Sequence, residues 1–177
     1  MKWKKRYTVI LFLAVSLLSC TRHDQQRGKS VFRYNEAANI TTLDPAFARD
    51  QTIIWAAKQL FNGLVQMDDH MAIRPCIART WSVSGDGLVY TFRLRRDVFF
   101  HDSPAFKKGK GRRVVSADVL FSFRRITDPK VASPGAWIFN NISRDPARPP
   151  FEAPDDTTFR IRLSRPFPPF LSLLSMQ

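Results

Sequence analysis

Alternating apolar and polar positions predict a β-hairpin near the middle of the chain. The run Tyr90-Thr91-Phe92-Arg93-Leu94-Arg95 alternates between large apolar and polar side chains, which is the period of a strand with one buried face. Before it, Ser84-Gly85-Asp86-Gly87 supplies glycines where a tight turn needs them. Trp81 and Val83 precede the turn. We therefore expect a hairpin with one face exposed to solvent.

Helical spacing of apolar residues begins upstream, at Thr52, and continues to Leu64. Gly63 lies where such a helix can stop. Trp55 stands beside the apolar stripe, and an aromatic residue in that position usually belongs to the core. The alternative for Trp55 is a side chain that faces a ligand.

A second helix is expected from Ser116. The serine suits an N-cap, and Asp118 favours the positive end of the helix dipole. Val119 and Phe123 share one face. Thr127-Asp128-Pro129 ends this helix, and a last helix is expected to begin at Phe170, after a proline-rich stretch.

Composition and alternation predict the structure of three further segments. Val31–Asn35 looks like a first strand, and the alternation from Thr158 to Leu163 predicts another strand with Phe159 turned inward. The proline-rich stretch 146–154 is expected to form a loop.

The first 20 residues have the pattern of a targeting segment. Basic residues end at Arg6, and the apolar run Val9–Leu18 is too short to span a bilayer but suits a signal peptide. Leu17-Leu18-Ser19-Cys20 resembles the lipobox of bacterial lipoproteins, which implies a signal peptide at 1–19 and a lipid on Cys20. An ordinary secretory signal with an incidental cysteine is the alternative. Residues 20–30 are polar beyond the cysteine and are expected to form a flexible tether.

The high net positive charge suggests binding to nucleic acid, but the distribution of the basic residues along the chain argues against it. The formal net charge is +13, but four of the 28 basic residues lie in the leader, which leaves 24 against 15 acidic residues. The remainder is scattered, apart from a cluster at 107–113. That cluster could bind phosphates of nucleic acid or anionic lipid, yet glycines interrupt it and no aromatic residues interleave with it. A solvated loop is the preferred interpretation, and no nucleic acid is expected.

No motif indicates an enzyme. The three histidines and two cysteines are far apart and do not have metal-ligand spacing. The sequence carries no nucleophile elbow, phosphate loop or dinucleotide motif. Cys76, between Pro75 and Ile77, is expected to act as a small buried apolar residue. We expect no catalytic residue, metal or cofactor.

The order of six short motifs resembles the family 5 extracellular solute-binding proteins, the receptors of bacterial ABC importers for peptides and dipeptides. In order along the chain these motifs are Leu43-Asp44-Pro45, Pro75-Cys76-Ile77-Ala78 followed by Trp81, Asp86-Gly87, Tyr90-Thr91-Phe92-Arg93-Leu94-Arg95, Phe100-His101-Asp102 and Ala117-Asp118-Val119. The basic insertion at 107–113 departs from the family pattern. The resemblance extends from about Val31 to the C-terminus.

This resemblance implies an α+β fold, the partial first lobe of a periplasmic-binding-protein type II fold, with a mixed sheet and flanking helices over 31–177. Because the chain ends within an apolar helix, we expect an incomplete lobe. The implied function is capture of a peptide or similar small solute outside the cytoplasmic membrane. The implied partners are ABC permease subunits and the membrane that holds the lipid anchor.

The resemblance also implies site residues. The segment after Leu-Asp-Pro supplies part of the peptide-binding edge in the family, which falls here on Arg49, Asp50 and Gln51. Asp50 could meet the amino terminus of a peptide, or it could merely cap the following helix. Relatives can carry an aromatic residue where this chain has Gly135, so Trp137, two residues on, is a weaker candidate for stacking on the ligand.

Overall fold

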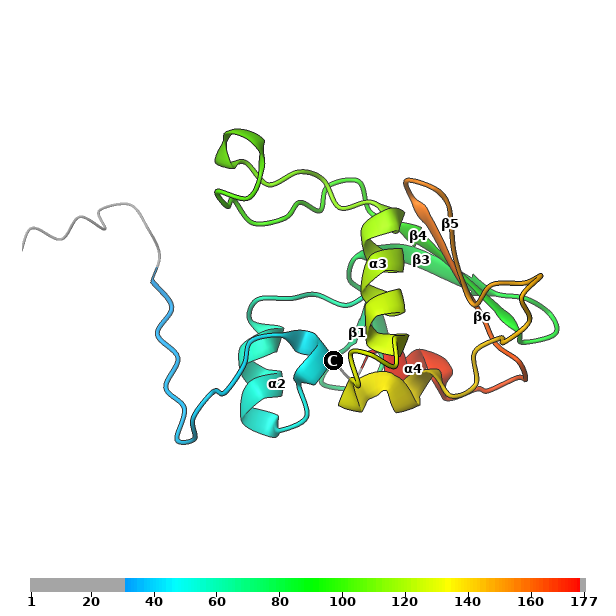
Figure 1. Cartoon of the computed structure of the whole chain (residues 1–177), viewed down its shortest axis with the longest axis horizontal. Helices are drawn as coiled ribbons and strands as arrows, with labels where there is room; N and C mark the ends of the chain where they lie inside the picture. The colour runs from blue at the N-terminus through cyan, green and yellow to red at the C-terminus, as the bar shows by residue number, and fades with distance from the viewer. Residues whose placement is uncertain (1–30, 176–177) are drawn as a thin grey trace, which may run out of the picture. The chain divides into compact units, whose positions relative to one another are not determined.

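The computed structural model describes residues 31–175 (Figure 1). The chain divides into two units, residues 1–35 and 36–177. Cys20 and the predicted signal peptide and tether lie outside the described residues. In the described part of the first unit, Val31–Asn35 belongs to neither sheet, so the predicted first strand is wrong. Alternation of side chains makes a strand only where another strand supplies the hydrogen bonds.

The second unit contains two antiparallel sheets and the helices around them. A small hairpin pairs β1 (Val65–Met67) with β2 (Ile73–Pro75). The larger sheet has the strand order β3-β4-β6-β5 and contains β3 (Ala78–Val83), β4 (Val89–Leu94), β5 (Phe151–Asp155) and β6 (Thr158–Arg162). All its pairs are antiparallel in the described residues, whereas the resemblance implied a sheet of mixed direction. The predicted α+β class is confirmed.

The central hairpin forms as predicted. β3 and β4 pair with Trp81 opposite Phe92 and Val83 opposite Tyr90. Gly87 closes the turn at a φ of 70°, a conformation that glycine adopts without strain. Phe92 is fully buried and Arg93 is exposed, so the strand has the one buried face that its alternation indicated.

Strand β5 lies in the stretch that was predicted to be only a loop. It occupies the edge of the larger sheet, and its pairing with β6 shifts register between Glu152 and Asp155. Pro154 falls inside this irregular part. A proline cannot donate to a strand ladder, but an edge or a bulge tolerates it, so the sheet edge accepts a segment that composition alone assigns to a loop.

Helix α3 (Ser116–Thr127) packs on this sheet (Figure 1). A cluster of phenylalanines is buried between them. The Phe123 ring lies 5.1 Å from that of Phe159 and 5.3 Å from that of Phe139, measured between ring centroids. The Phe123–Phe139 pair is edge-to-face and the Phe123–Phe159 pair is tilted, and such aromatic contacts add to the stabilisation from burial. Helix α4 (Phe170–Leu174) begins where predicted and buries Phe170 in the same core.

The start of α3 differs by one residue from the prediction. Val115 occupies the N-cap position, and its backbone N–H donates to the Asp118 carboxylate at 2.9 Å. Ser116 is the first helical residue, and its buried hydroxyl donates to the backbone carbonyl of Asp155. A contact with β5, distant in sequence, therefore uses the hydroxyl that was expected to cap the helix.

Helix α2 (Gln51–Lys58) is shorter than the predicted 52–64 segment. Leu64 lies in a bend directly before β1, and its carbonyl accepts from the Ala78 N–H at 2.9 Å. Trp55 was expected in the core, but 48% of its surface is exposed. Ile53, Ala56 and Ala57 are the buried residues of this helix, so its buried face turned out narrower than the apolar pattern indicated.

Two short 3₁₀-helices flank these longer helices. They are η2 (Pro45–Phe47), which precedes α2, and η4 (Pro134–Phe139), which follows α3. No helix within residues 31–175 combines the length and the apolar character needed to cross a bilayer.

Candidate functional site

An apolar cavity of about 320 Å³ opens among the helical elements of the second unit. Its walls come from η2, α2, η4 and α4 together with the end of α3. Most of the lining is apolar or aromatic, and includes Ile54, Ala57, Phe61, Ile126, Ile138, Phe139 and Leu173. Two cationic side chains, Arg49 and Lys58, reach this lining. A concave apolar surface with few charged groups is the usual form of a site for a small solute.

The Leu-Asp-Pro turn contributes Pro45 to the wall of this cavity. One Asp44 carboxylate oxygen accepts from the Ala46 N–H at 3.0 Å, which starts η2 at Pro45. The same carboxylate accepts hydrogen bonds from both terminal guanidinium nitrogens of Arg125 on α3, at 2.9 and 2.6 Å. The hydrogen bond from Arg125 holds the pKa of Asp44 below its ordinary value. This bidentate pair fastens the turn to α3.

A second contact joins the two 3₁₀-helices. The buried Ser133 hydroxyl, just before η4, donates to the backbone carbonyl of Ala46 at 2.6 Å. Ser133 also accepts from the Gly135 N–H at 3.2 Å and so starts η4. The segments that carry Arg49 and Trp137 are therefore joined by the buried hydrogen bond from Ser133 to Ala46.

The structure brings two of the predicted site residues together. Arg49 and Trp137 line the same apolar cavity, although they are far apart in sequence, and 53% of Trp137 is exposed. Arg49 also lines an adjoining cavity of about 310 Å³, and so does Asp50. Gln51 is exposed and lines neither cavity.

Asp50 occupies the N-cap position of α2, but its side chain makes no capping hydrogen bond. Its carboxylate instead lies 3.6 Å from the Arg49 guanidinium, and both side chains are largely exposed. Such exposed pairs contribute little to stability. The carboxylate is therefore not committed to the helix, and it stays a candidate for contact with a solute.

Sequence reasoning missed Lys58 and Phe61, which line the apolar cavity from the end of α2. Phe61 was placed beside the apolar stripe of a longer helix, so its exposure at 48% was unexpected. In the sequence, the signal for this part of the site is a basic residue followed three positions later by an aromatic residue. That spacing indicates a binding surface only when the helix is known to end at Lys58.

The basic loop at 107–113 is partly neutralised by neighbouring acidic residues. Three of its five cations form ion pairs, which are Lys110 with Asp102 at 2.7 Å, Arg112 with Asp118 at 2.5 Å and Arg113 with Asp156 at 3.7 Å. The Arg112 guanidinium also lies 5.0 Å from the Phe100 ring centroid. The loop contains the 3₁₀-helix η3 (Lys107–Gly109) and is anchored rather than merely solvated. Within residues 31–175, Lys107 and Lys108 have no ion pair, so two of the five positive charges stay uncompensated.

Within the described residues, the structure brings no set of metal-ligating side chains together and leaves Cys76 as a free cysteine. No group of histidine, cysteine, aspartate or glutamate side chains within residues 31–175 could hold a metal ion. Cys76 is half-buried rather than buried, and that burial raises the pKa of its thiol. A raised thiol pKa disfavours the reactive thiolate at neutral pH.

Known proteins resemble this chain in sequence and in structure. A sequence model of the bacterial extracellular solute-binding proteins, family 5 (Middle), matches residues 72–177. The glutathione-binding protein GsiB of Escherichia coli O1:K1 is 33% identical over 138 residues, which are 78% of this chain and 24% of GsiB.

Solved structures agree with this match. The periplasmic binding protein DppA of Helicobacter pylori, in complex with the peptide STSA, is 35% identical with a TM-score of 0.60, over 75% of this chain and 28% of DppA. OppA of Listeria monocytogenes bound to peptide is 27% identical with a TM-score of 0.69, over 79% of this chain and 28% of OppA.

The chain therefore spans about a quarter of the length of these relatives. The structural likeness confirms the predicted part of a periplasmic-binding-protein type II fold. The family match covers more than half of the chain and includes the central hairpin, α3 and the strand β6. This chain belongs to the bacterial extracellular solute-binding proteins of family 5.

Proposed function

We propose that this chain is part of the solute-binding component of an ABC importer and that it contributes the apolar cavity to the capture of a peptide or similar small solute. The observation that carries the proposal is the meeting of Arg49 and Trp137 at that cavity in a chain of family 5. Relatives bind glutathione or peptides by name, and both are small peptides with charged ends.

The chemistry of the lining suits such a solute. Arg49 and Lys58 can attract a carboxylate, and the guanidinium of Arg49 can hold it through two parallel hydrogen bonds. The exposed ring of Trp137 offers a surface for an apolar side chain of the solute. Asp50, in the adjoining cavity, can meet an ammonium group. We assign no role to Gln51 in this arrangement, since it lines neither cavity.

This role is binding and not catalysis. Receptors of this kind enclose the solute between lobes and present it to a permease in the membrane. The proposed partners are accordingly permease subunits of an ABC importer, and the proposed location is the cell envelope outside the cytoplasmic membrane.

Replacing Trp137 by alanine is expected to weaken solute binding about tenfold, because a stacking surface at the cavity wall is lost. Glutathione and trialanine are the probes, and isothermal titration calorimetry on the purified chain is the measurement. Arg49→Gln is expected to weaken both probes similarly, since each carries a free carboxylate.

Trp55→Ala is the matched control for this test. Trp55 is exposed to a similar extent, at 48% against 53%, and it does not line the cavity. The control is expected to bind both probes as the parent does. Equal weakening by the two tryptophan variants, or no saturable binding of either peptide to the parent chain, would contradict the assignment of this cavity.

We further propose that a lipid on Cys20 holds the protein on a membrane, on the basis of the Leu17-Leu18-Ser19-Cys20 sequence. Each acyl methylene placed in the bilayer contributes about 0.8 kcal/mol, so several chains anchor firmly. Cys20→Ala is expected to move the protein from the membrane to the soluble fraction and to abolish incorporation of radiolabelled palmitate. Cys76→Ala should change neither readout. Continued labelling of the Cys20→Ala protein would refute the anchor.

A further inference from the structure

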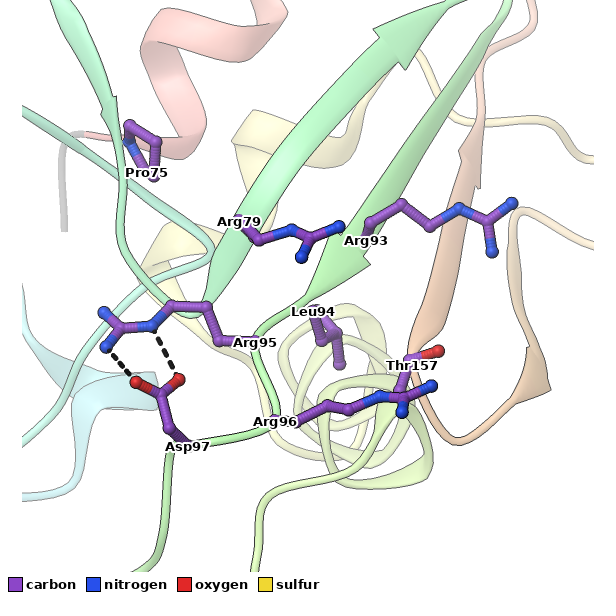
Figure 2. Close-up of a pocket in the computed structure, with 8 residues that line it drawn as sticks. All are labelled: Pro75, Arg79, Arg93, Leu94, Arg95, Arg96, Asp97 and Thr157. Atoms are coloured by element: carbon purple, nitrogen blue, oxygen red, sulfur yellow. Dashed lines mark hydrogen bonds and ion pairs between the residues drawn. The ribbon is translucent and has the colours of Figure 1, made fainter.

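An open groove of about 1030 Å³ on the sheet side of the second unit is lined by four arginines (Figure 2). Arg79 comes from β3 and Arg93 from β4, while Arg95 and Arg96 follow β4 directly. Asp97 is the one acidic residue in the lining. The groove shares no residue with either cavity described above, so it is a separate surface.

A bulge in the sheet creates this concentration of charge. Ala78 pairs with Leu94 and Thr80 pairs with Arg93, which leaves Arg79 as an extra residue on β3. Regular alternation would place Arg79 and Thr80 on opposite faces of the sheet. The bulge exposes both of them, and Figure 2 shows the Arg79 side chain extending toward Arg93.

The positive charge of the groove is only partly compensated. The Arg95 guanidinium donates to both carboxylate oxygens of Asp97, at 3.0 and 2.8 Å, and this bond lowers the pKa of Asp97. Arg93 donates to the neutral Thr158 hydroxyl at 2.5 Å. Within residues 31–175, Arg79 and Arg96 have neither a hydrogen-bonded side-chain partner nor an ion pair. Three cations thus share one groove without a counter-charge.

We propose that this groove binds a ligand carrying phosphate groups. A single exposed ion pair contributes little free energy. A ligand with one negative charge would therefore bind this groove only weakly. Phosphate oxygens can accept paired hydrogen bonds from several guanidinium forks at once, which a lone carboxylate cannot do. The ligand can be a soluble polyphosphate or the headgroups of anionic phospholipid, and these two sources share the same phosphate chemistry.

The double variant Arg79→Gln/Arg96→Gln tests the proposal. Isothermal titration of the purified full chain with inorganic tripolyphosphate is expected to show binding that weakens with added salt and that the double variant weakens at least about tenfold. Co-sedimentation with phosphatidylglycerol vesicles, compared with phosphatidylcholine vesicles, distinguishes the lipid source from the soluble one.

The matched control is Arg124→Gln/Arg144→Gln, which removes the same charge from two exposed arginines outside the groove. This control should weaken binding less than about threefold, because it changes only the long-range electrostatic field of the protein. If the groove variant alone loses binding to either probe, the result supports the site. The probe that is affected shows whether the phosphate belongs to a soluble ligand or to a lipid. Equal loss in both variants shows a net-charge effect and overturns the proposal, as does the absence of binding to both tripolyphosphate and phosphatidylglycerol.

Discussion

Phe159→Ala is expected to lower the free energy of unfolding by about 3–5 kcal/mol, the range for truncating a buried phenylalanine. The side chain is 0% exposed on β6, and its ring lies against those of Phe123 on α3 and Phe151 on β5. Alanine leaves a cavity between the sheet and the helix. Domains of this size are stable by only about 5–15 kcal/mol, so the loss is a large part of the total.

Phe121→Ala is the control of identical chemistry. Phe121 lies on the same helix as Phe123 but is 69% exposed. Its truncation should change stability by no more than about 0.5 kcal/mol. Urea unfolding followed by circular dichroism measures both variants. If the two midpoints shift by similar amounts, the phenylalanine cluster is not the stabilising core of this unit.

Gly111→Ala is expected to cost about 1–3 kcal/mol, the usual range for forcing extra atoms into a packed position, and to fall at the upper end. A Cβ atom at residue 111 would lie 1.8 Å from the carbonyl oxygen of Phe100 and 2.6 Å from its carbonyl carbon. Backbone atoms cannot turn aside as a side chain can. The loop must therefore shift. This shift is expected to break or lengthen the hydrogen bond from the Phe100 N–H to the Arg112 carbonyl, whose N···O distance is 2.9 Å.

Gly85→Ala provides the comparison, because a Cβ atom there meets nothing within 4 Å. Its stability should remain within about 1 kcal/mol of the parent. Thermal unfolding reports the global effect. Trypsin cleavage after Lys107 and Lys108 reports local opening of the loop, and it should accelerate in the Gly111 variant alone. Unchanged cleavage together with unchanged stability would show that Phe100 and Gly111 are not in close contact.

The candidate site was partly accessible from the sequence. Arg49 and Trp137 were both named from the family resemblance, but 88 positions separate them and no pattern states that they share a cavity. Their meeting depends on the bond from the Ser133 hydroxyl to the Ala46 carbonyl and on the Asp44–Arg125 pair. Such long-range polar contacts leave no periodic signal in the chain.

The errors have one common cause. The predicted helix was extended to Leu64 and a core position was given to Trp55 because local apolar spacing continued through both. In the structure the Leu64 carbonyl accepts a hydrogen bond from the Ala78 N–H, and Trp55 is half exposed. Local patterns cannot show which neighbour will cover an apolar side chain, and tertiary contacts override them.

The amino-acid sequence by itself determined the family, the hairpin around Gly87, the buried faces of β4 and β6 and the start of α4, because each follows from local alternation, turn chemistry or short motifs. Tertiary structure alone decided the strand at the proline-rich edge, the bulge that turns Arg79 outward and the cavity that joins Arg49 to Trp137. The physical reason is that a strand edge, a register shift and a cavity are each made by two segments. Neither segment contains the information about its partner.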